Sequence, residues 1–354
     1  MNVELPICLL NWINPDKIHW EGLSQNTSEG AIQLLKKKPN KISWSYLSAN
    51  SSEGAIQLLE KTPNKIYWIN LSRNLSAMQL LEKNQDKIHW DWLCLNPSAM
   101  QLLEKNQHRI NWYLLSKISS AIQLIEKNPD KIDWGWLCFN ESEGAMQLLE
   151  QNPDKIHWAE LSSNPSAIQL LKNNPDKISW NNLSGNKSEG AMRLLETNTY
   201  KIDWRILSNN PLAIQLLENN QNEIDWYNLS QNPSKGAMQL LEKNPDKINW
   251  DNLSHNKSKY AIQILEKNPD KINWKLLSEN QSKCTVQLLE KNPNKIDWYW
   301  LSKNPYIFNY DYKQMKQNCM LFKEDLMKNR FHPRNISKFR HWKVNGFEFD
   351  SDLN

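Results

Sequence analysis

One tryptophan recurs thirteen times along this chain, at intervals of either 22 or 24 residues. Isoleucine stands two residues before each of these marker tryptophans, and leucine stands three residues after it. Self-similarity at a fixed period of this length is typical of stacked repeat units that contact only their neighbours. We number the copies 1 to 13 by their markers, which are Trp20, Trp44, Trp68, Trp90, Trp112, Trp134, Trp158, Trp180, Trp204, Trp226, Trp250, Trp274 and Trp298.

Each marker is expected to open a short helix. In copy 10, Asp225 can accept hydrogen bonds from the first backbone N–H groups of such a helix. Ile224 then precedes the cap and Leu229 is the fourth helical residue, the two positions of a hydrophobic staple. Nine of the thirteen cap positions hold Asp, Asn or Ser; the others hold His19, Tyr67, His89 and His157. The pattern predicts a first helix of about two turns, ending near the LSxN motif.

A second helix follows in the stretch written AIQLLEKN or a close variant. Asn96 and Pro97 are favourable cap and first helical residues, and the apolar residues of 99–103 follow a helical period. The NPD motif then ends the helix, because proline disfavours helical geometry in the residue before it. The longer copies insert a pair such as Glu29 and Gly30 at the start of this helix.

These patterns predict an all-α fold, an α-solenoid of short helix pairs. A single pair cannot hold a core, but stacked pairs share one. With helix axes about 8–10 Å apart, we expect a rod or superhelix that extends on the order of 100 Å. We assign residues 1–17 to an N-terminal cap and residues 18–304 to the repeat solenoid.

The repeat ends after Asn304. Apolar residues between 312 and 326 step by three and four, which predicts one longer amphipathic helix that caps the last copy. Residues 305–343 are assigned to this capping helix and a basic segment, and residues 344–354 to a polar tail. Residues 303–343 hold ten Lys or Arg against three acids, and 344–354 hold three acids and no base. With a total formal charge of +4, residues 1–302 therefore carry no net charge.

The five cysteines show no disulfide-framework or metal-ligand spacing, which indicates a reducing compartment. Cys94 and Cys138 stand where other copies carry serine, so we interpret them as small buried residues. The first residues show neither a signal peptide nor a long apolar run, and we expect no membrane-spanning helix.

The units written LLEKNPDKIDWxxLSxNPSAIQLL resemble a repeat found in many proteins of amoeba-infecting giant double-stranded DNA viruses, the mimivirus relatives. The block NPYIFNYDYKQMKQNCMLFKEDLMKNRFHPRN at 304–335 resembles the closing segment of the same proteins. The resemblance covers nearly the whole chain and implies a helical repeat protein, located in the host cytoplasm or in the virion. It brings no catalytic residue.

No enzymatic or cofactor site emerges from the sequence. His19, His89 and His157 share one position in separate, non-adjacent copies, so we expect no metal site among them. No nucleophile–base set and no paired carboxylates in a recognisable setting are present. We therefore expect a non-enzymatic protein without a cofactor.

Two repeated side chains admit a structural and a functional interpretation. The marker tryptophans are expected in the core, and the alternative is a series of stacking platforms for nucleobases. A glutamine recurs in the second helix of 11 of 12 copies, with Arg193 as the exception. A structural hydrogen bond to a neighbouring turn is the expected role, and a ladder that reads a ligand is the alternative.

The two residues after each marker vary while the scaffold stays constant, and in repeat proteins such positions often carry the binding surface. Trp92, Tyr113 and Trp136 fall there in three consecutive copies, and large exposed aromatics are typical anchors of interfaces. We predict that these three form the hot spot for a protein partner. Alternatively, the positions are unconstrained, or some of these rings pack against a neighbouring copy. A second pair, Tyr299 and Trp300, is expected to be buried under the C-terminal helix.

Nucleic-acid binding is the alternative function. Helical repeats can read one base each, but the uncharged repeat body argues against it because phosphate contacts need clustered positive charge. The basic segment keeps a weaker version open, with the candidates Lys316, Lys323, Arg330, Arg334 and Arg340. The sequence identifies neither the partner nor the oligomeric state.

Overall fold

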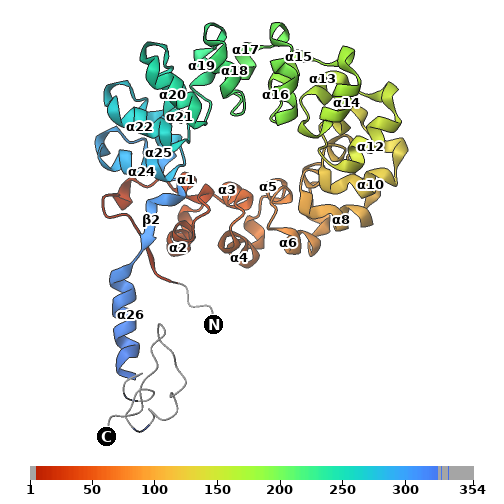
Figure 1. Ribbon diagram of the computed structural model, residues 1–354. Coiled ribbons are helices and arrows are strands. Elements are labelled where there is room, and N and C mark those ends of the chain that lie inside the picture. Colours follow the sequence, from red (N-terminus) through yellow and green to blue (C-terminus); the bar gives the residue numbers. More distant parts are fainter. Residues whose placement is uncertain (1–4, 326–327, 329–333, 335–354) are drawn as a thin grey trace. The chain divides into compact units, whose positions relative to one another are not determined.

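The computed structural model describes residues 5–325, 328 and 334. The chain divides into two compact units, one of residues 11–307 and one that combines residues 1–10 with residues 308–354. All thirteen copies lie in the first unit, which we call the repeat unit (Figure 1). The predicted all-α solenoid of short helix pairs is confirmed.

Each copy begins with a 3-10 turn and a first helix that starts at the marker tryptophan. The turns are η1 Pro15–Lys17, η2 Pro39–Lys41, η3 Pro63–Lys65, η4 Gln85–Lys87, η6 Gln107–Arg109, η8 Pro129–Lys131, η9 Pro153–Lys155, η11 Pro175–Lys177, η12 Thr199–Lys201, η13 Gln221–Glu223, η14 Pro245–Lys247, η15 Pro269–Lys271 and η16 Pro293–Lys295. The first helices are α1 Trp20–Gln25, α3 Trp44–Ala49, α5 Trp68–Ser72, α7 Trp90–Cys94, α9 Trp112–Leu115, α11 Trp134–Leu137, α13 Trp158–Ser162, α15 Trp180–Ser184, α17 Trp204–Ser208, α19 Trp226–Leu229, α21 Trp250–His255, α23 Trp274–Glu279 and α25 Trp298–Leu301.

The second helices follow in copies 1 to 12. They are α2 Glu29–Lys37, α4 Glu53–Lys61, α6 Met78–Glu82, α8 Met100–Lys105, α10 Ile122–Glu126, α12 Glu143–Gln151, α14 Ile168–Asn173, α16 Glu189–Glu196, α18 Ile214–Asn219, α20 Lys235–Lys243, α22 Lys259–Lys267 and α24 Lys283–Glu290. The 3-10 turns η5 Pro97–Ala99, η7 Ser119–Ala121 and η10 Pro165–Ala167 precede three of the short ones, and η17 Pro305–Ile307 ends the repeat unit.

The two-residue insertion in the longer copies changes the length of the second helix. Copies of 22 residues have second helices of five or six residues, whereas copies of 24 residues have one continuous helix of eight or nine. In the longer copies a serine such as Ser28 accepts a hydrogen bond from the backbone N–H three residues on and caps the helix.

The core repeats with the sequence. The leucine three residues after each marker is fully buried in all thirteen copies, from Leu23 to Leu301. The cap residue predicted from Asp225 also forms as expected, since its carboxylate accepts from the backbone N–H of Asn228 at 2.8 Å. Cys94 and Cys138 are fully buried, as predicted for residues at a serine position.

A serine relay joins each copy to the next. Ser162 donates to the carbonyl oxygen of Trp158 at 2.7 Å and accepts from the backbone N–H of Ser179 in the next copy at 3.0 Å. Cys94 accepts in the same way from Asn111 at 3.3 Å. Burial raises the pKa of the Cys94 thiol, and that of Cys138 to about 11. Both thiols are therefore neutral at physiological pH.

A ladder of buried asparagines runs beside this relay. The Asn164 amide donates to the carbonyl oxygens of Cys138 at 2.8 Å and Asn140 at 2.9 Å, both in the preceding copy. Its own oxygen accepts from the backbone N–H of Ser166 at 2.9 Å and so caps the turn η10, which leads into the second helix. Twelve copies carry this residue: Asn26, Asn50, Asn74, Asn96, Asn140, Asn164, Asn186, Asn210, Asn232, Asn256, Asn280 and Asn304. Copy 5 has Ile118 instead.

The repeat unit closes into a ring, because copy 1 contacts copy 13 through the same bonds. The backbone N–H of His19 donates to the Ser302 hydroxyl at 2.9 Å. The Asn26 amide donates to the carbonyl oxygens of Ser302 at 3.1 Å and Asn304 at 2.8 Å. Helix α1 packs on α25 as α3 packs on α1 and α25 on α23, and Figure 1 shows α1 and α25 side by side. The ladder therefore continues across the seam between copies 13 and 1, and its one gap lies at Ile118 of copy 5.

The expectation of a rod or superhelix that extends on the order of 100 Å was wrong, because copies 1 and 13 are in contact. A rod was inferred from stacking alone, and stacking does not fix the curvature that brings copy 13 back to copy 1. Within the repeat unit, the first helices of copies 1 and 13 pack against each other.

The marker tryptophans are half-buried between copies and are not enclosed in the core, which corrects the expectation. At five markers, Trp68, Trp90, Trp134, Trp180 and Trp298, a cation from the next copy lies over the indole; Lys155, for example, is 5.1 Å from the ring centre of Trp134. At the closure, Lys17 is 5.3 Å from the ring centre of Trp298. The same contact type thus recurs at the seam between copies 13 and 1.

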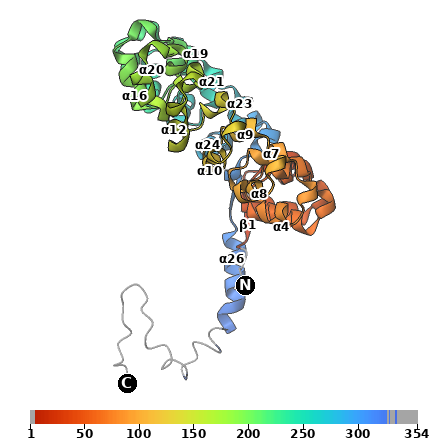
Figure 2. The ribbon, with the colours of Figure 1, turned by 90° about the vertical axis from the view of Figure 1, so that its right-hand side faces the viewer.

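The smaller unit contains a two-stranded antiparallel sheet and a helix. Strand β1 Ile7–Leu9 pairs with β2 Phe308–Tyr310, with Cys8 opposite Asn309. The predicted amphipathic helix is α26, Tyr312–Asp325, a single helix in both views (Figures 1 and 2).

We expect Asn164→Ala to lower the free energy of unfolding by about 2–4 kcal/mol, because it leaves buried backbone carbonyls without a donor. Urea unfolding followed by circular dichroism measures the loss. Asn173→Ala is the control, since Asn173 is exposed at the end of α14 and its loss should cost less than about 0.5 kcal/mol. Equal effects of the two substitutions would contradict the role of the ladder.

The seam is predicted to fail first in Gly22→Val. A Cβ atom at Gly22 would lie 2.6 Å from the backbone oxygen of Tyr299, so copies 1 and 13 must move apart. Hydrogen exchange should become at least tenfold faster in α1 and α25, about 1.4 kcal/mol, while α13 and α15 keep their protection. Gly135→Val, where a Cβ meets only side-chain atoms, should leave the seam unchanged. Unaltered protection of α1 in Gly22→Val would disprove the closure.

Candidate interaction face

The variable residues of the first helices share one surface. A side chain two residues after a marker contacts the residues one and five positions after the preceding marker. Thus Trp136 of copy 6 lies against Tyr113 of copy 5, with ring centres 5.1 Å apart in an edge-to-face arrangement. Lys117 of copy 5 is 5.2 Å from the Trp136 ring centre. We call the residues one, two and five positions after all markers the first-helix face.

Two of the three predicted anchors meet. Tyr113 is 51% exposed and Trp136 is half-buried. Phe139, whose ring centre is 5.9 Å from that of Trp136, extends the cluster, and Lys117 lies 5.2 Å from Phe139 as well. Sequence reasoning missed Lys117 and Phe139, because only the two residues directly after each marker were compared.

Trp92 does not join this cluster. Its ring is covered by the Arg73 guanidinium at 4.5 Å and lies 6.4 Å from the His89 ring. Arg73 holds the same position relative to Trp92 as Lys117 holds relative to Trp136. The alternative that some rings pack against a neighbouring copy therefore applies to Trp92.

A second aromatic cluster lies at the seam. The ring of Tyr299 contacts His19 of copy 1 at 4.8 Å and Trp300 at 5.1 Å, both edge-to-face. Lys303 lies over both of these copy 13 rings, 4.5 Å from Tyr299 and 4.1 Å from Trp300. A side-chain hydrogen bond with Tyr299 raises the pKa of Tyr46, in copy 2. Sequence reasoning expected Tyr299 and Trp300 under the C-terminal helix, whereas Tyr299 contacts copy 1.

The first-helix face is uncharged on balance and rich in rings. Among its 39 residues, five are acidic and five are Lys or Arg. Eight are aromatic: Tyr46, Trp92, Tyr113, Trp136, Phe139, Tyr227, Tyr299 and Trp300. Such a surface favours apolar and hydrogen-bonding partners over a polyanion.

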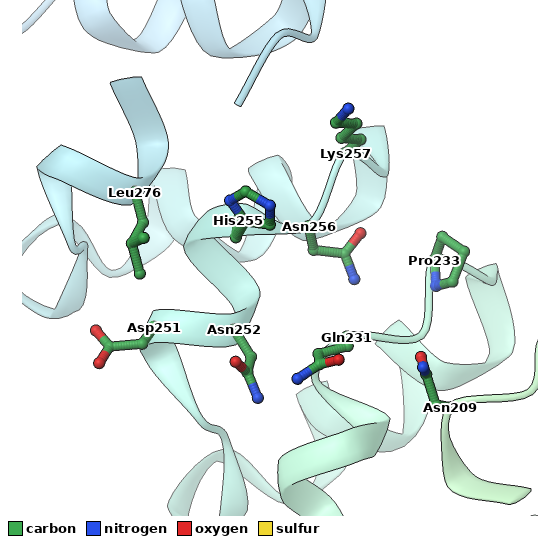
Figure 3. Close-up of a pocket in the computed structure, with 9 residues that line it drawn as sticks. All are labelled: Asn209, Gln231, Pro233, Asp251, Asn252, His255, Asn256, Lys257 and Leu276. Atoms are coloured by element: carbon green, nitrogen blue, oxygen red, sulfur yellow. The ribbon is translucent and has the colours of Figure 1, made fainter. Parts of the chain in front are cut away.

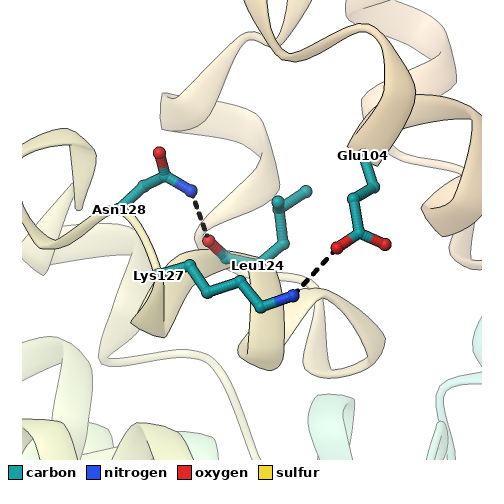
Figure 4. Close-up of polar contacts among 4 residues, drawn as sticks. All are labelled: Glu104, Leu124, Lys127 and Asn128. Carbon is teal, nitrogen blue, oxygen red and sulfur yellow. Dashed lines mark hydrogen bonds and ion pairs between the residues drawn. The ribbon is translucent and has the colours of Figure 1, made fainter.

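The second helices present a repetitive, charged surface. Lys127 pairs with Glu104 of the preceding copy at 2.9 Å, while Asn128 donates to the carbonyl oxygen of Leu124 at 2.8 Å and ends the helix (Figure 4). The same ion pair recurs between Lys267 and Glu242. These pairs are solvent-exposed and contribute at most about 1 kcal/mol each.

The glutamine row lies on this second-helix surface. Every member except half-buried Gln33 is exposed, as is Arg193. Gln57 and Gln147 bond to glutamates of their own helices, and Gln169 bonds to Asn173. For these three, the expected bond to a neighbouring turn was wrong.

The nucleic-acid candidates are described only in part. Lys316 and Lys323 are exposed on α26, and Arg334 is exposed. Arg330 and Arg340 lie outside the described residues.

Within residues 5–325, 328 and 334, no group of three or more His, Cys, Asp or Glu side chains could hold a metal ion. Over the same described part, no helix is both long enough and apolar enough to cross a membrane.

A polar pocket lies on the first-helix face across copies 9 to 12, and sequence reasoning did not find it. Its volume is about 570 Å³, and Figure 3 shows its lining. We call it the amide groove; it is lined by Asn209, Gln231, Pro233, Asp251, Asn252, His255, Asn256, Lys257 and Leu276. Its distinguishing position, five residues after the marker, was not among those compared in the sequence.

Comparison with known protein families, curated proteins and solved structures finds no match to this chain.

Proposed function

We propose that the chain is a non-enzymatic repeat scaffold that binds a protein partner on its first-helix face. The observation that carries this proposal is the cluster of exposed Tyr113 with half-buried Trp136 and Phe139, with Lys117 over two of the rings. Exposed aromatics beside a cation are enriched at the centres of protein interfaces. The scaffold around them repeats, whereas the face varies from copy to copy.

The resemblance of the repeat and of the terminal block supports a setting in a giant DNA virus, and we propose a partner present in infected amoebae. The face has no excess of positive charge, which supports a protein over a nucleic acid as the partner.

We expect the double variant Tyr113→Ala, Trp136→Ala to lose at least tenfold in affinity for the partner, because a hot-spot aromatic contributes about 2 kcal/mol or more. The partner is captured from infected-cell lysate with the tagged full chain, identified by mass spectrometry and titrated in purified form. Circular dichroism checks that the variant folds.

The matched control is Tyr200→Ala. Tyr200 is an aromatic residue 81% exposed in the turn η12, outside the first-helix face, so its loss should leave affinity unchanged. If the Tyr113, Trp136 variant binds the partner with unchanged affinity, this cluster is not the binding hot spot.

A second candidate function, nucleic-acid binding through the basic segment, is favoured by one observation. Three lysines of α26, Lys313, Lys316 and Lys323, are exposed along one helix. Exposed lysines can neutralise phosphates without reading sequence.

For this candidate, replacing Lys316 and Lys323 with glutamine should reduce the slope of log affinity against log salt by about two, roughly 0.9 per lost phosphate contact on duplex DNA. The slope is measured by fluorescence titration of labelled duplex DNA at several salt concentrations between about 50 and 200 mM. Partners that survive nuclease treatment of the lysate would speak against this candidate, and partners that vanish would contradict the protein scaffold.

A further inference from the structure

The contact between copies 4 and 5, which we call the 4–5 interface, lacks a rung of the asparagine ladder. The asparagines of the other copies are at most 5% exposed, whereas Ile118 of copy 5 is half-buried and has no hydrogen to donate. The carbonyl oxygens of Cys94 and Asn96 in copy 4 therefore receive no amide from this position. The equivalent oxygens of copy 6 both receive the Asn164 amide.

The missing amide leaves a buried oxygen of copy 4 without a donor. Cys94 is fully buried at the end of α7. Pro97, three residues further on, has no backbone N–H, and the backbone N–H of Ser98 donates to the Asn96 side chain at 3.0 Å. A buried carbonyl oxygen without a donor is costly, and water can bond to it once copies 4 and 5 separate.

The serine relay is weakened at the same place. There it runs through the Cys94 thiol, which accepts from the backbone N–H of Asn111 at 3.3 Å. Sulfur is a weak acceptor, and a thiol is a weak donor. Cys138 also replaces a relay serine, between copies 6 and 7, but Asn164 provides a complete rung there. Among the thirteen interfaces, which all lie within residues 11–307, only the 4–5 interface lacks both the hydroxyl and the amide.

Besides the thiol contact, the side-chain hydrogen bonds across the 4–5 interface lie at its exposed edge. The Asn111 amide donates to Asp91 at 2.9 Å, and Lys127 pairs with Glu104 at 2.9 Å (Figure 4). The Ser120 hydroxyl donates to a carbonyl oxygen of copy 4 at 3.3 Å. Water competes for such exposed contacts, so they contribute little. Apolar packing thus holds this interface closed without a buried amide or hydroxyl bond.

The seam between copies 13 and 1 is better bonded than the 4–5 interface. It has a hydroxyl relay, in which Ser302 accepts from His19, and a rung with two bonds from Asn26. Local openings of a folded chain occur where the free energy of opening is lowest. The ring should therefore loosen first between copies 4 and 5.

We propose that the 4–5 interface is the gate of the ring, which opens while the other interfaces, the seam included, stay closed. Opening converts the ring into an arc whose ends are copies 5 and 4. The contact between Tyr113 and Trp136 joins copies 5 and 6, so it lies on one side of the gate and persists in the arc. The gate therefore opens whether or not this cluster binds a partner.

Thiol labelling of the full chain tests the gate, because Cys94 and Cys138 form a matched pair. Both are fully buried and both replace a relay serine, but only Cys138 has a complete rung beside it. Excess N-ethylmaleimide, followed by mass spectrometry of the peptides, should modify Cys94 at least about tenfold faster than Cys138. Two neutral hydrogen bonds set this minimum, since each changes an equilibrium constant roughly three- to tenfold.

Restoring the rung should close the gate. Ile118→Asn should slow the labelling of Cys94 to about the rate of Cys138, because the new amide can reach the two free oxygens of copy 4. Ile118→Val is the matched control, since valine is also aliphatic and cannot donate, and it should not slow the labelling. Asn164→Ile should move the defect to copies 6 and 7 and speed up the labelling of Cys138.

Three results would overturn the proposal. The first is equal labelling of Cys94 and Cys138 in the unaltered chain. The second is a Cys94 rate that Ile118→Asn leaves unchanged, or that Ile118→Val lowers equally. The third is hydrogen exchange that is faster in α1 and α25 than in α7 and α9, which would place the first opening at the seam.

Discussion

The buried asparagine amide is the interaction on which the rest of the repeat unit depends. Most rungs donate to two carbonyl oxygens of the preceding copy and cap the turn that leads into their own second helix, as Asn164 does with Cys138, Asn140 and Ser166. A buried amide with all its partners is stable, and one without them is costly. Adjacent copies are therefore held in one register. Because Asn26 makes the same bonds to copy 13, the ladder crosses the seam, and only copy 5, which has Ile118, lacks a rung.

The residue types predicted the local structure of each copy well, but they did not predict that copies 1 and 13 meet to close a ring. The cap at Asp225, the buried leucines and the serine role of Cys94 follow from local chemistry that a short sequence window contains. Closure depends on a small rotation repeated over thirteen interfaces, which no window contains. Gly22 is the one residue that carries a signal, because only copy 1 has glycine two positions after its marker, where Tyr299 approaches closely.

The candidate site was predicted in part for a related reason. Tyr113 and Trp136 meet because one variable position contacts the next copy's variable position, a relation that holds across copies. Trp92 was placed with them by its order in the chain, but Arg73 covers its ring. The amide groove was missed because its residues lie five positions after the marker, where no single copy looks unusual. A nearly constant ladder thus supports a variable face, an arrangement consistent with the proposed role in partner binding.

The distance between copies 1 and 13 tests most directly whether the repeat unit closes into a ring. Spin labels at Lys17 and Lys295, in a chain with its five cysteines replaced by serine, occupy equivalent turns of those copies. The ring predicts the same distance as between labels at Lys131 and Lys155 of the adjacent copies 6 and 7. An open rod would place the first pair on the order of 100 Å apart, and that result would contradict the account.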